Sequence, residues 1–599
     1  MSTIAAVQPP KLWKYILGAL IALLILIPLW AVFVGQVIQP DSFILTQEQS
    51  MSNKWIWPVV RWIVLLPVAI VALFFGARWM SASKNVQATG QQIATEQVVA
   101  SDQSKREYVL EVIGMGVTLD KYRQGKLWEA LQKGSPYVTI REQDTKKYPW
   151  SDMDKSGLSG GRGGDSLENG AQYTPMYYGV PVFNAEPPVL NSRMLDKPDD
   201  PNPGLAAGAV SSGMAWHLFV VGPRRFGEHP DRILDDVFAF FDANPDVPYI
   251  VLNSADGVES RDSFRPEGTP ALVKDGYYIP EMPDASTLFV LARRERVDAV
   301  RPFVWDDPDN KVVQGTLRWM YGELMEAVPH PKRKKILRTP AQVGADQTHH
   351  EASDPAQRIP LVSEWLEAAA AFAQRPDMRG AGVVNVLNGV NPWIHRPPKE
   401  WKPTPWFPIP WNKDQLATFD RLPSLGFIHR PTFVKFTDEH GKPLTRRDER
   451  EKVLQAGWQE ALRTLPEAER LKAPARIVMA TGGNTDQLIA LHSTLNAYAA
   501  QGGPEFDSAK SDQFIDTDKR LGNTGATTLF MQMAIGVMGS YRDGGVSAAV
   551  NLRDTNEASI VFISPPSEEK RKTQKHPSGG DVFAHHGTPA VDPANYPSN

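Results

Sequence analysis

The stretch PYIVLNS (residues 248–254) decides how this chain folds, together with WHLFVVG (216–222) and EHPDRILDDVFAFFDANP (228–245) before it. WHLFVVG and PYIVLNS are short apolar runs, which are typical of strands covered on both faces. Residues 228–245, which lie between these two runs, have apolar side chains at helical spacing. Strand, helix and strand in this order predict parallel strands joined by a crossover helix. STLFVLARR (286–294) predicts a further strand.

The last third of the chain follows the same pattern. ARIVMATGG (475–483) predicts a strand that ends in glycines, and DQLIALHSTLNAYAAQG (486–502) predicts the helix after it. GATTLFMQMAIGVMGSYRDGG (525–545) predicts a buried helix, and strands are expected at 546–552 and 558–566. The two units are broadly alike, which is compatible with an old duplication. We therefore predict an α/β protein with two tandem α/β domains.

Two apolar runs precede these domains. Residues 15–38 carry no charge and are long enough to cross a hydrocarbon core of about 30 Å as a helix. The second run, about 55–76, holds only Arg61, near its start, from where it can reach the interface. We predict an N-terminal transmembrane helical hairpin. The few flanking lysines and arginines favour both chain ends in the cytoplasm.

The expected organisation follows the composition of successive segments. The glycine-rich residues 151–172 are expected to form a loop. In chain order we predict two membrane helices within 1–80, a linker over 81–106, an α/β domain with a helical insertion over 107–390, a Pro/Trp-rich interdomain segment over 391–425, a second α/β domain over 426–566 and a disordered tail over 567–599.

Composition excludes several classes of function. The chain has no cysteine, so it has no disulfide, no thiolate metal site and no cysteine nucleophile. Its formal net charge of −4 gives no basic field that would attract nucleic acid, and we expect no nucleic-acid partner. Hydrophobic residues make up 42% of the 599, which excludes wholesale disorder.

Motifs for catalysis or cofactor binding are weak. AVSSG (209–213) lacks the first glycine of a nucleophile elbow and precedes a strand instead of following one. The glycine-containing loops 481–486 and 522–528 lack the lysine of a phosphate-binding loop. Ordinary capping, with Asn484 or Thr485 at the start of a helix, is favoured over an anion site. Histidines with metal-binding helical spacing are absent from the sequence. We predict no catalytic residue, no cofactor and no metal.

The segment NPWIHRPPKEWKPTPWFPIPW (391–411) holds seven prolines and four tryptophans. Proline excludes a regular helix or a central strand here. Packing between the two domains is one interpretation. A partner-binding surface is the other, because tryptophan is enriched at interface hot spots. Under the second interpretation, at least one of four side chains is exposed and contacts a protein partner: Trp393, Trp401, Trp406 and Trp411.

Several long segments resemble the type VI lipase adapter proteins. They are EYVLEVIGMGVTLDKYRQGKLWEAL (107–131), AWHLFVVGPRRFGEHPDRILDDVFAFFDANPDVPYIVLNSADG (215–257), PWFPIPWNKDQLATFDRLPSLGFIHRPTFVKF (405–436) and DTDKRLGNTGATTLFMQMAIGVMGSYRDGGVSAAVNLRD (516–554). The likeness lies in whole segments and spreads over most of 107–565. It implies a non-catalytic protein that binds a lipase effector of the bacterial type VI secretion system and helps to load it onto the spike.

The resemblance and the apolar runs together predict a two-pass adapter of the bacterial inner membrane with cytoplasmic α/β domains. Its expected partners are a lipase effector, the spike protein and the lipid bilayer. Two alternatives stay open: a membrane-tethered, hydrolase-like α/β enzyme whose site residues converge only in three dimensions, and an envelope scaffold without an effector. A tight cleft lined by histidine and carboxylates would favour the enzyme. A broad apolar groove near the Trp-rich segment would favour the adapter.

Overall fold

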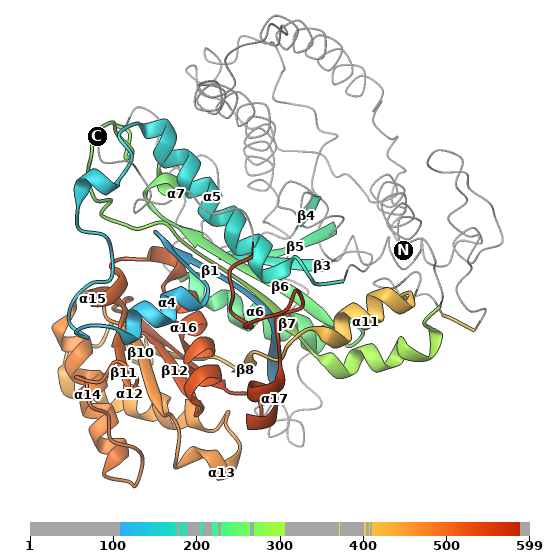
Figure 1. Cartoon of the computed structure of the whole chain (residues 1–599). Coiled ribbons are helices and arrows are strands. Elements are labelled where there is room, and N and C mark those ends of the chain that lie inside the picture. The colour runs from blue at the N-terminus through green and yellow to red at the C-terminus, as the bar shows by residue number, and fades with distance from the viewer. Residues whose placement is uncertain are drawn as a thin grey trace, which may run out of the picture. The chain divides into compact units, whose positions relative to one another are not determined.

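The computed structural model describes residues 108–175, 180–185, 204–207, 218–225, 229–263, 269–305, 400–402 and 410–586, with a few single positions between them (Figure 1). These residues belong to one compact unit of the chain, Ala82–Pro329 with Pro360–Asn599. The other unit, Met1–Ser81 with His330–Ile359, lies outside the described residues.

The described strands form one mixed sheet in the order β11-β10-β12-β13-β8-β1-β7-β6-β3-β5-β4, with β2 beside β1 and β9 beside β13. The strands are β1 (Val109–Leu119), β2 (Tyr122–Arg123), β3 (Val180–Ala185), β4 (Gly204–Ala207), β5 (Leu218–Arg225), β6 (Tyr249–Asp256), β7 (Ala285–Ala292), β8 (Gly426–His429), β9 (Thr432–Lys435), β10 (Arg476–Ala480), β11 (Phe514–Asp516), β12 (Ser547–Asn551) and β13 (Glu557–Ser564).

Helices connect and cover these strands. The α-helices are α4 (Gly125–Gln132), α5 (Asp152–Ala171), α6 (Ile233–Ala243), α7 (Val258–Ser263), α11 (Lys413–Arg421), α12 (Arg447–Leu462), α13 (Glu467–Arg470), α14 (Thr485–Ala499), α15 (Thr517–Leu521), α16 (Thr528–Asp543) and α17 (Glu568–Thr573). Short 3₁₀ turns are η2 (Thr145–Lys147), η4 (Pro230–Arg232), η5 (Arg294–Ala299), η6 (Arg301–Phe303) and η8 (Gly525–Thr527).

The sheet consists of two halves with the same strand order. The N-terminal half runs β5-β3-β6-β7-β1 and the C-terminal half runs β11-β10-β12-β13-β8. In each half the first three strands are parallel and the next two are antiparallel to their neighbours. The predicted crossover is confirmed, since β5 and β6 run parallel with β3 between them. The shared order supports an internal duplication.

The prediction of two tandem α/β domains is wrong. β1 and β8 pair antiparallel from Val109↔His429 to Val112↔Gly426, so strands of both predicted domains belong to one sheet. Apolar runs identify strands and their buried faces, but they do not specify which strand lies alongside which. The boundary at 391–425 therefore separates stretches of sequence that share a sheet.

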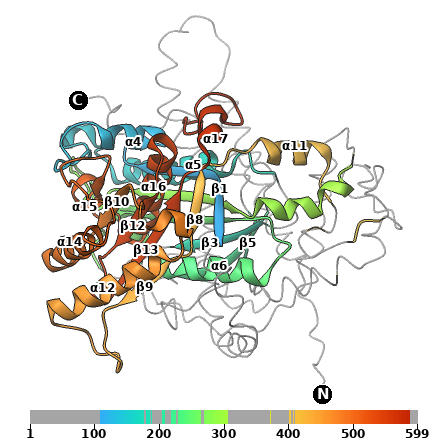
Figure 2. The ribbon, with the colours of Figure 1, turned by 90° about the horizontal axis from the view of Figure 1, so that it is seen from below.

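The C-terminal half is covered on both faces. α16 lies on one face, where Ser547 of β12 donates a hydrogen bond to the Gly536 carbonyl at 3.0 Å. α12 and α14 pack side by side on the other face (Figure 2). Their core includes Trp458, Leu491 and Val550, all nearly inaccessible to solvent.

The glycine-rich segment predicted to be a loop is helix α5. Ser151 caps it by accepting a hydrogen bond from the Asp154 amide at 3.1 Å. The helix lies so close to β1 that a Cβ atom at Gly116 would overlap the Ser166 carbonyl. Glycine weakens a helix by about 1 kcal/mol per residue, and close packing on the sheet outweighs this cost here.

Residues 567–586, expected to belong to a disordered tail, form α17 and a segment that returns to α4 and α5. The Gly125 amide donates to the Phe583 carbonyl at 3.0 Å. The His586 amide donates to Asn169 Oδ1 at 2.8 Å. Val582 and Phe583 are buried, which gives this otherwise polar stretch an apolar anchor.

In the described part of the chain, no helix has the length and apolar character needed to cross a membrane. The runs 15–38 and 55–76 lie outside the described residues. A long apolar run is also what a helix buried in protein presents, as α16 does, so the run alone does not define a span. The predicted transmembrane hairpin and the two-pass inner-membrane location are not supported, and both are withdrawn.

Candidate functional site

A polar cleft of about 510 Å³ is lined by residues of both halves of the sheet. The turn η4 leads into α6 of the N-terminal half and η8 leads into α16 of the C-terminal half, and the two turns contact each other. The connection between β12 and β13 forms another wall. We call this site the interhalf cleft, and its lining includes His229, Asp231, Arg261, Asn551, Arg553, Asp554, Glu557 and Ser559.

Asp231 is the most perturbed acid of the interhalf cleft. Burial raises the pKa of its carboxyl to about 6, although hydrogen bonds from Ser559 and Asn551 oppose the shift. Ser559 Oγ donates to Asp231 Oδ2 at 2.7 Å and Asn551 Nδ2 donates to the same atom at 2.8 Å. One carboxylate of the N-terminal half thus holds two donors of the C-terminal half.

Asp256 makes a second connection between the halves at the end of β6. Its buried carboxylate accepts two hydrogen bonds from Arg261, both at 2.9 Å. It also accepts the Ala526 amide of η8 at 2.7 Å. Gly525 has φ +56°, and a Cβ atom there would collide with Asp256, so this turn requires glycine. The loop 522–528 therefore binds a carboxylate of the chain itself.

The other glycine loop, 481–486, is arranged in the same way. The amides of Thr481 and Gly482 donate to Asp518 Oδ2 at 2.6 and 2.7 Å. Arg553 donates to the other oxygen of Asp518 at 2.9 Å. Asn484 caps α14 through the amides of the first turn, which confirms the predicted capping role. An external anion would have to displace an internal carboxylate from either loop.

The outer wall of the interhalf cleft consists of ion pairs. Arg232 donates to both oxygens of Glu557, with Nε at 2.8 Å from Oε1. His229 Nδ1 lies 2.7 Å from Asp554 Oδ2. Burial raises the pKa of Asp554, but hydrogen bonds from His229 and from the Asn556 amide outweigh it and lower that pKa overall. The charged groups are thus paired with each other.

The chemistry of the interhalf cleft bears on the enzyme alternative. A histidine and carboxylates do line one concave site, and a perturbed acid in a cleft is a recognised sign of a functional site. However, the Ser559 hydroxyl donates to Asp231, and the chain has no cysteine. Among the described residues, no group of three or more histidines and acids is placed to hold a metal ion.

The predicted partner-binding tryptophans occupy different environments. Trp411 is 1% exposed and packs with the rings of Tyr249 and Phe419, in the core of the N-terminal half. Trp401 is half-buried, and its Nε1 donates to the Phe407 carbonyl at 3.3 Å. Two of the four, Trp393 and Trp406, lie outside the described residues. A role of this segment in partner binding stays a prediction.

Sequence reasoning missed an exposed aromatic surface on the N-terminal half. Trp150 is 57% exposed, Met153 53% and Tyr277 39%. The Trp150 and Tyr277 rings meet edge to face at 5.3 Å. We call these three side chains the Trp150 patch. Their signal in the sequence is an aromatic residue beside aspartates in YPWSDMD (148–154), which resembles an ordinary helix start.

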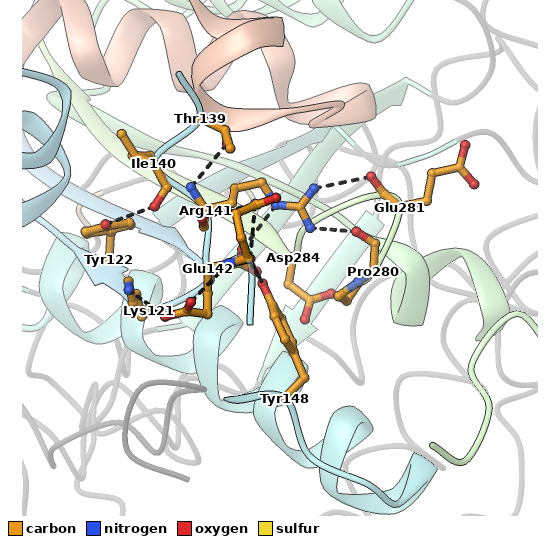
Figure 3. Close-up of polar contacts among 12 residues, drawn as sticks. Lys121, Tyr122, Thr139, Ile140, Arg141, Glu142, Tyr148, Pro280, Glu281 and Asp284 are labelled. Carbon is orange, nitrogen blue, oxygen red and sulfur yellow. Dashed lines mark hydrogen bonds and ion pairs between the residues drawn. The ribbon is translucent and has the colours of Figure 1, made fainter. Parts of the chain in front are cut away.

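A polar network fixes the segment that leads to the Trp150 patch (Figure 3). Arg141 donates to the Pro280 carbonyl at 2.6 Å and to Asp120 Oδ2 at 3.3 Å. Tyr148 is buried, and its hydroxyl donates to the Glu142 carbonyl at 3.3 Å. Burial, and then the nearby Asp120, raise the pKa of Tyr148 well above its usual value, so this hydroxyl remains a donor.

Comparison with known families identifies the class of this protein. The family described as "Type VI lipase adapter protein Tla3, N-terminal" matches residues 108–275, and its C-terminal counterpart matches residues 425–565. The first match contains β1 to β6, the second contains β8 to β13, and together they span more than half of the chain. The chain belongs to the type VI lipase adapter protein family.

Three solved ketosynthase structures show a distant likeness. The ishigamide ketosynthase/chain length factor is 10% identical, with coverage of 77% of this chain and 100% of that chain and a TM-score of 0.35. A ketosynthase of the bacillaene synthase from Bacillus subtilis is 7% identical, with coverage of 77% and 71% and a TM-score of 0.35. An oxazolomycin ketosynthase domain from Streptomyces albus is 9% identical, with coverage of 80% and 100% and a TM-score of 0.33. TM-scores this low do not establish a shared fold or a shared activity.

Proposed function

We propose that this protein is a non-catalytic adapter that binds a lipase effector of the type VI secretion system and helps to load it onto the secretion spike. The observation that carries the proposal is that both halves of the sheet match the lipase adapter family. The hydrogen bonds that Asp231 and Asp256 accept from the other half agree with it, because these carboxyl groups stabilise the contact between the halves.

Binding of a lipase is the first test. The full chain is immobilised, and each type VI lipase of the source bacterium is purified and passed over it. We expect one of them to bind specifically, with a Kd in the micromolar range or below, while a secreted lipase unrelated to type VI secretion does not bind. Absence of binding by every type VI lipase would overturn the proposal.

Loading is tested with purified spike protein on beads. We expect more lipase on the spike when the full chain is present than when it is absent. If the chain binds the spike but never increases the amount of retained lipase, a scaffold role is favoured instead.

The interhalf cleft gives the enzyme alternative one specific observation, the carboxyl of Asp231 with its raised pKa in a cleft that also contains His229. The full chain is assayed with p-nitrophenyl esters beside its His229→Gln and Asp231→Asn variants. We expect no turnover above buffer. Turnover that both substitutions abolish, with folding intact, would favour the enzyme.

A further inference from the structure

We propose that the Trp150 patch is the surface on which the lipase effector docks, through an apolar area of the effector bordered by basic side chains. This inference rests on the proposed adapter function. It names the contact surface, which the family assignment leaves open.

Most of the large exposed apolar side chains among the described residues belong to the N-terminal stretch of the chain, and two of them, Trp150 and Tyr277, contact each other. Among the described residues, two large exposed hydrophobic side chains lie in the C-terminal half, Leu471 and Ile489. Six others lie between residues 137 and 277: Tyr137, Val138, Trp150, Met153, Leu272 and Tyr277. Clustered exposed apolar side chains mark protein interaction sites, whereas single ones need no explanation.

The two chain segments that carry the patch are clamped to each other. The Gly276 amide donates to the Trp150 carbonyl at 2.8 Å. The Asp152 amide donates to Asp275 Oδ1 at 3.0 Å. Lys155 Nζ donates to the carbonyls of Trp150 at 2.9 Å and Gly276 at 2.7 Å, which joins both segments to the first turn of α5.

Rigid support gives aromatic side chains the properties of a binding hot spot. The network around Arg141 and Tyr148 fixes the segment before Trp150 to the loop before β7 (Figure 3). A partner that covers Trp150 and Tyr277 therefore needs to order little backbone on this side. Affinity increases when a site is already ordered before binding, and tryptophan and tyrosine are enriched among hot-spot residues.

Charge around the patch indicates the chemistry of the partner. Asp152, Asp154 and Asp275 lie close enough to act on the Lys155 ammonium group. That group itself donates hydrogen bonds to three backbone carbonyls of the two segments. The exposed Lys274 also lies in this segment, so the border carries three carboxylates beside this lysine and is acidic on balance. A complementary partner surface carries lysine or arginine around its apolar centre.

The test compares the full chain with Trp150→Ala and Tyr277→Ala, using the purified type VI lipase that binds the unaltered protein. Leu471→Ala is the control, since Leu471 is 64% exposed and lies in the other half. We expect each patch variant to weaken the Kd about tenfold to thirtyfold, as truncation of a hot-spot aromatic does. Leu471→Ala should bind as the unaltered chain does, and all three melting temperatures should be unchanged.

A charge variant provides a second measurement. Asp152→Lys is expected to slow association with the lipase about tenfold at low ionic strength, and less at high salt, because border charges act mainly on the on-rate. If the unaltered chain binds a lipase and both aromatic variants bind it equally well, the docking surface is overturned while the adapter function stands. If the unaltered chain binds no type VI lipase, the function itself fails.

Two other occupants would also overturn the proposal. If Trp150→Ala converts a dimer of the chain into a monomer in analytical ultracentrifugation, a second copy occupies the patch. If the unaltered chain binds vesicles of phosphatidylethanolamine and phosphatidylglycerol and Trp150→Ala does not, a lipid surface occupies it.

Discussion

The two halves of the sheet share their strand order but differ in how their helices are covered. In the C-terminal half, every residue of α16 from Thr528 to Tyr541 is buried. In the N-terminal half, the corresponding helix α6 buries Ile233, Val237 and Phe241 and leaves Ala239, Asp242 and Ala243 exposed. The exposed Trp150 patch also belongs to the N-terminal half. Two similar arrangements of strands therefore differ in how completely their helices are buried.

The largest expected effects concern whether the halves are one folding unit. Each half has a core tryptophan, Trp411 against Tyr249 and Trp458 against Phe562. Trp411→Ala and Trp458→Ala should each lower the free energy of unfolding by about 3–5 kcal/mol, since both side chains are 1% exposed.

β1 and β8 join the halves in one sheet. We therefore expect the sheet to unfold in a single calorimetric transition, and either variant should lower the temperature of that transition. Two transitions, of which each variant moves only one, would show that the halves unfold separately. Trp150→Ala is the matched control and should leave this transition in place.

A pH-dependent effect of intermediate size tests the contact between the halves. Burial raises the pKa of Asp231 from 3.8 to about 6, so the folded state holds this proton more tightly than the unfolded state. The stability from this group is fully present below about pH 4 and is lost as the pH rises through 6. The loss amounts to about 3 kcal/mol at most.

Asp231→Asn removes the titrating group and keeps a hydrogen-bond acceptor for Ser559 and Asn551. We expect this variant to be more stable than the unaltered chain in urea at pH 7.5, with the difference shrinking toward pH 4. Asp512→Asn, at an exposed aspartate, is the control and should show no such trend. A difference that does not change with pH would contradict the assignment.

The smallest expected effects are at two glycines of α5, and Gly116 of β1 provides the contrast. A Cβ atom at Gly160 or Gly161 would meet nothing within 4 Å, so alanine there should raise the free energy of unfolding by about 1 kcal/mol each. Gly116→Ala should do the opposite, because its Cβ atom would overlap Ser166 on the facing helix. Thermal melts of the three variants check both signs. Stabilisation by Gly116→Ala would mean that α5 does not lie close to β1.

Local pattern predicted much of the fold. The runs at 248–254 and 286–294 correspond to β6 and β7, and the apolar segment 525–545 contains the buried helix α16. These elements bury most of their side chains, so hydrophobic spacing alone reveals them. The pairing of β1 with β8 could not be predicted in this way, because nothing in either strand specifies a partner some 300 residues away.

The candidate sites were less accessible from sequence. Asp231 gains its raised pKa from burial, which depends on how the fold brings the two halves together, while Asn551 and Ser559 of the other half donate hydrogen bonds that oppose the shift. The YPWSDMD segment gave no sign that Trp150 would remain exposed, because exposure depends on what covers a residue and not on its neighbours in the chain. The glycine content of α5 predicted a loop, because the close packing of this helix on β1 cannot be predicted from its own sequence.

The central pairing of β1 with β8 also has a consequence during biosynthesis. Val109 pairs with His429, which is synthesised much later. A ribosome that adds about 5–20 residues per second needs roughly 15–60 s to extend the chain from Val109 to His429. β7 can occupy one edge of β1 earlier, but the edge that β8 takes has no partner from its own chain during this interval. An apolar strand with an open edge readily pairs with other chains. Production of this protein should therefore depend on chaperones that bind nascent chains, and slow translation ahead of residue 426 should lower the soluble yield.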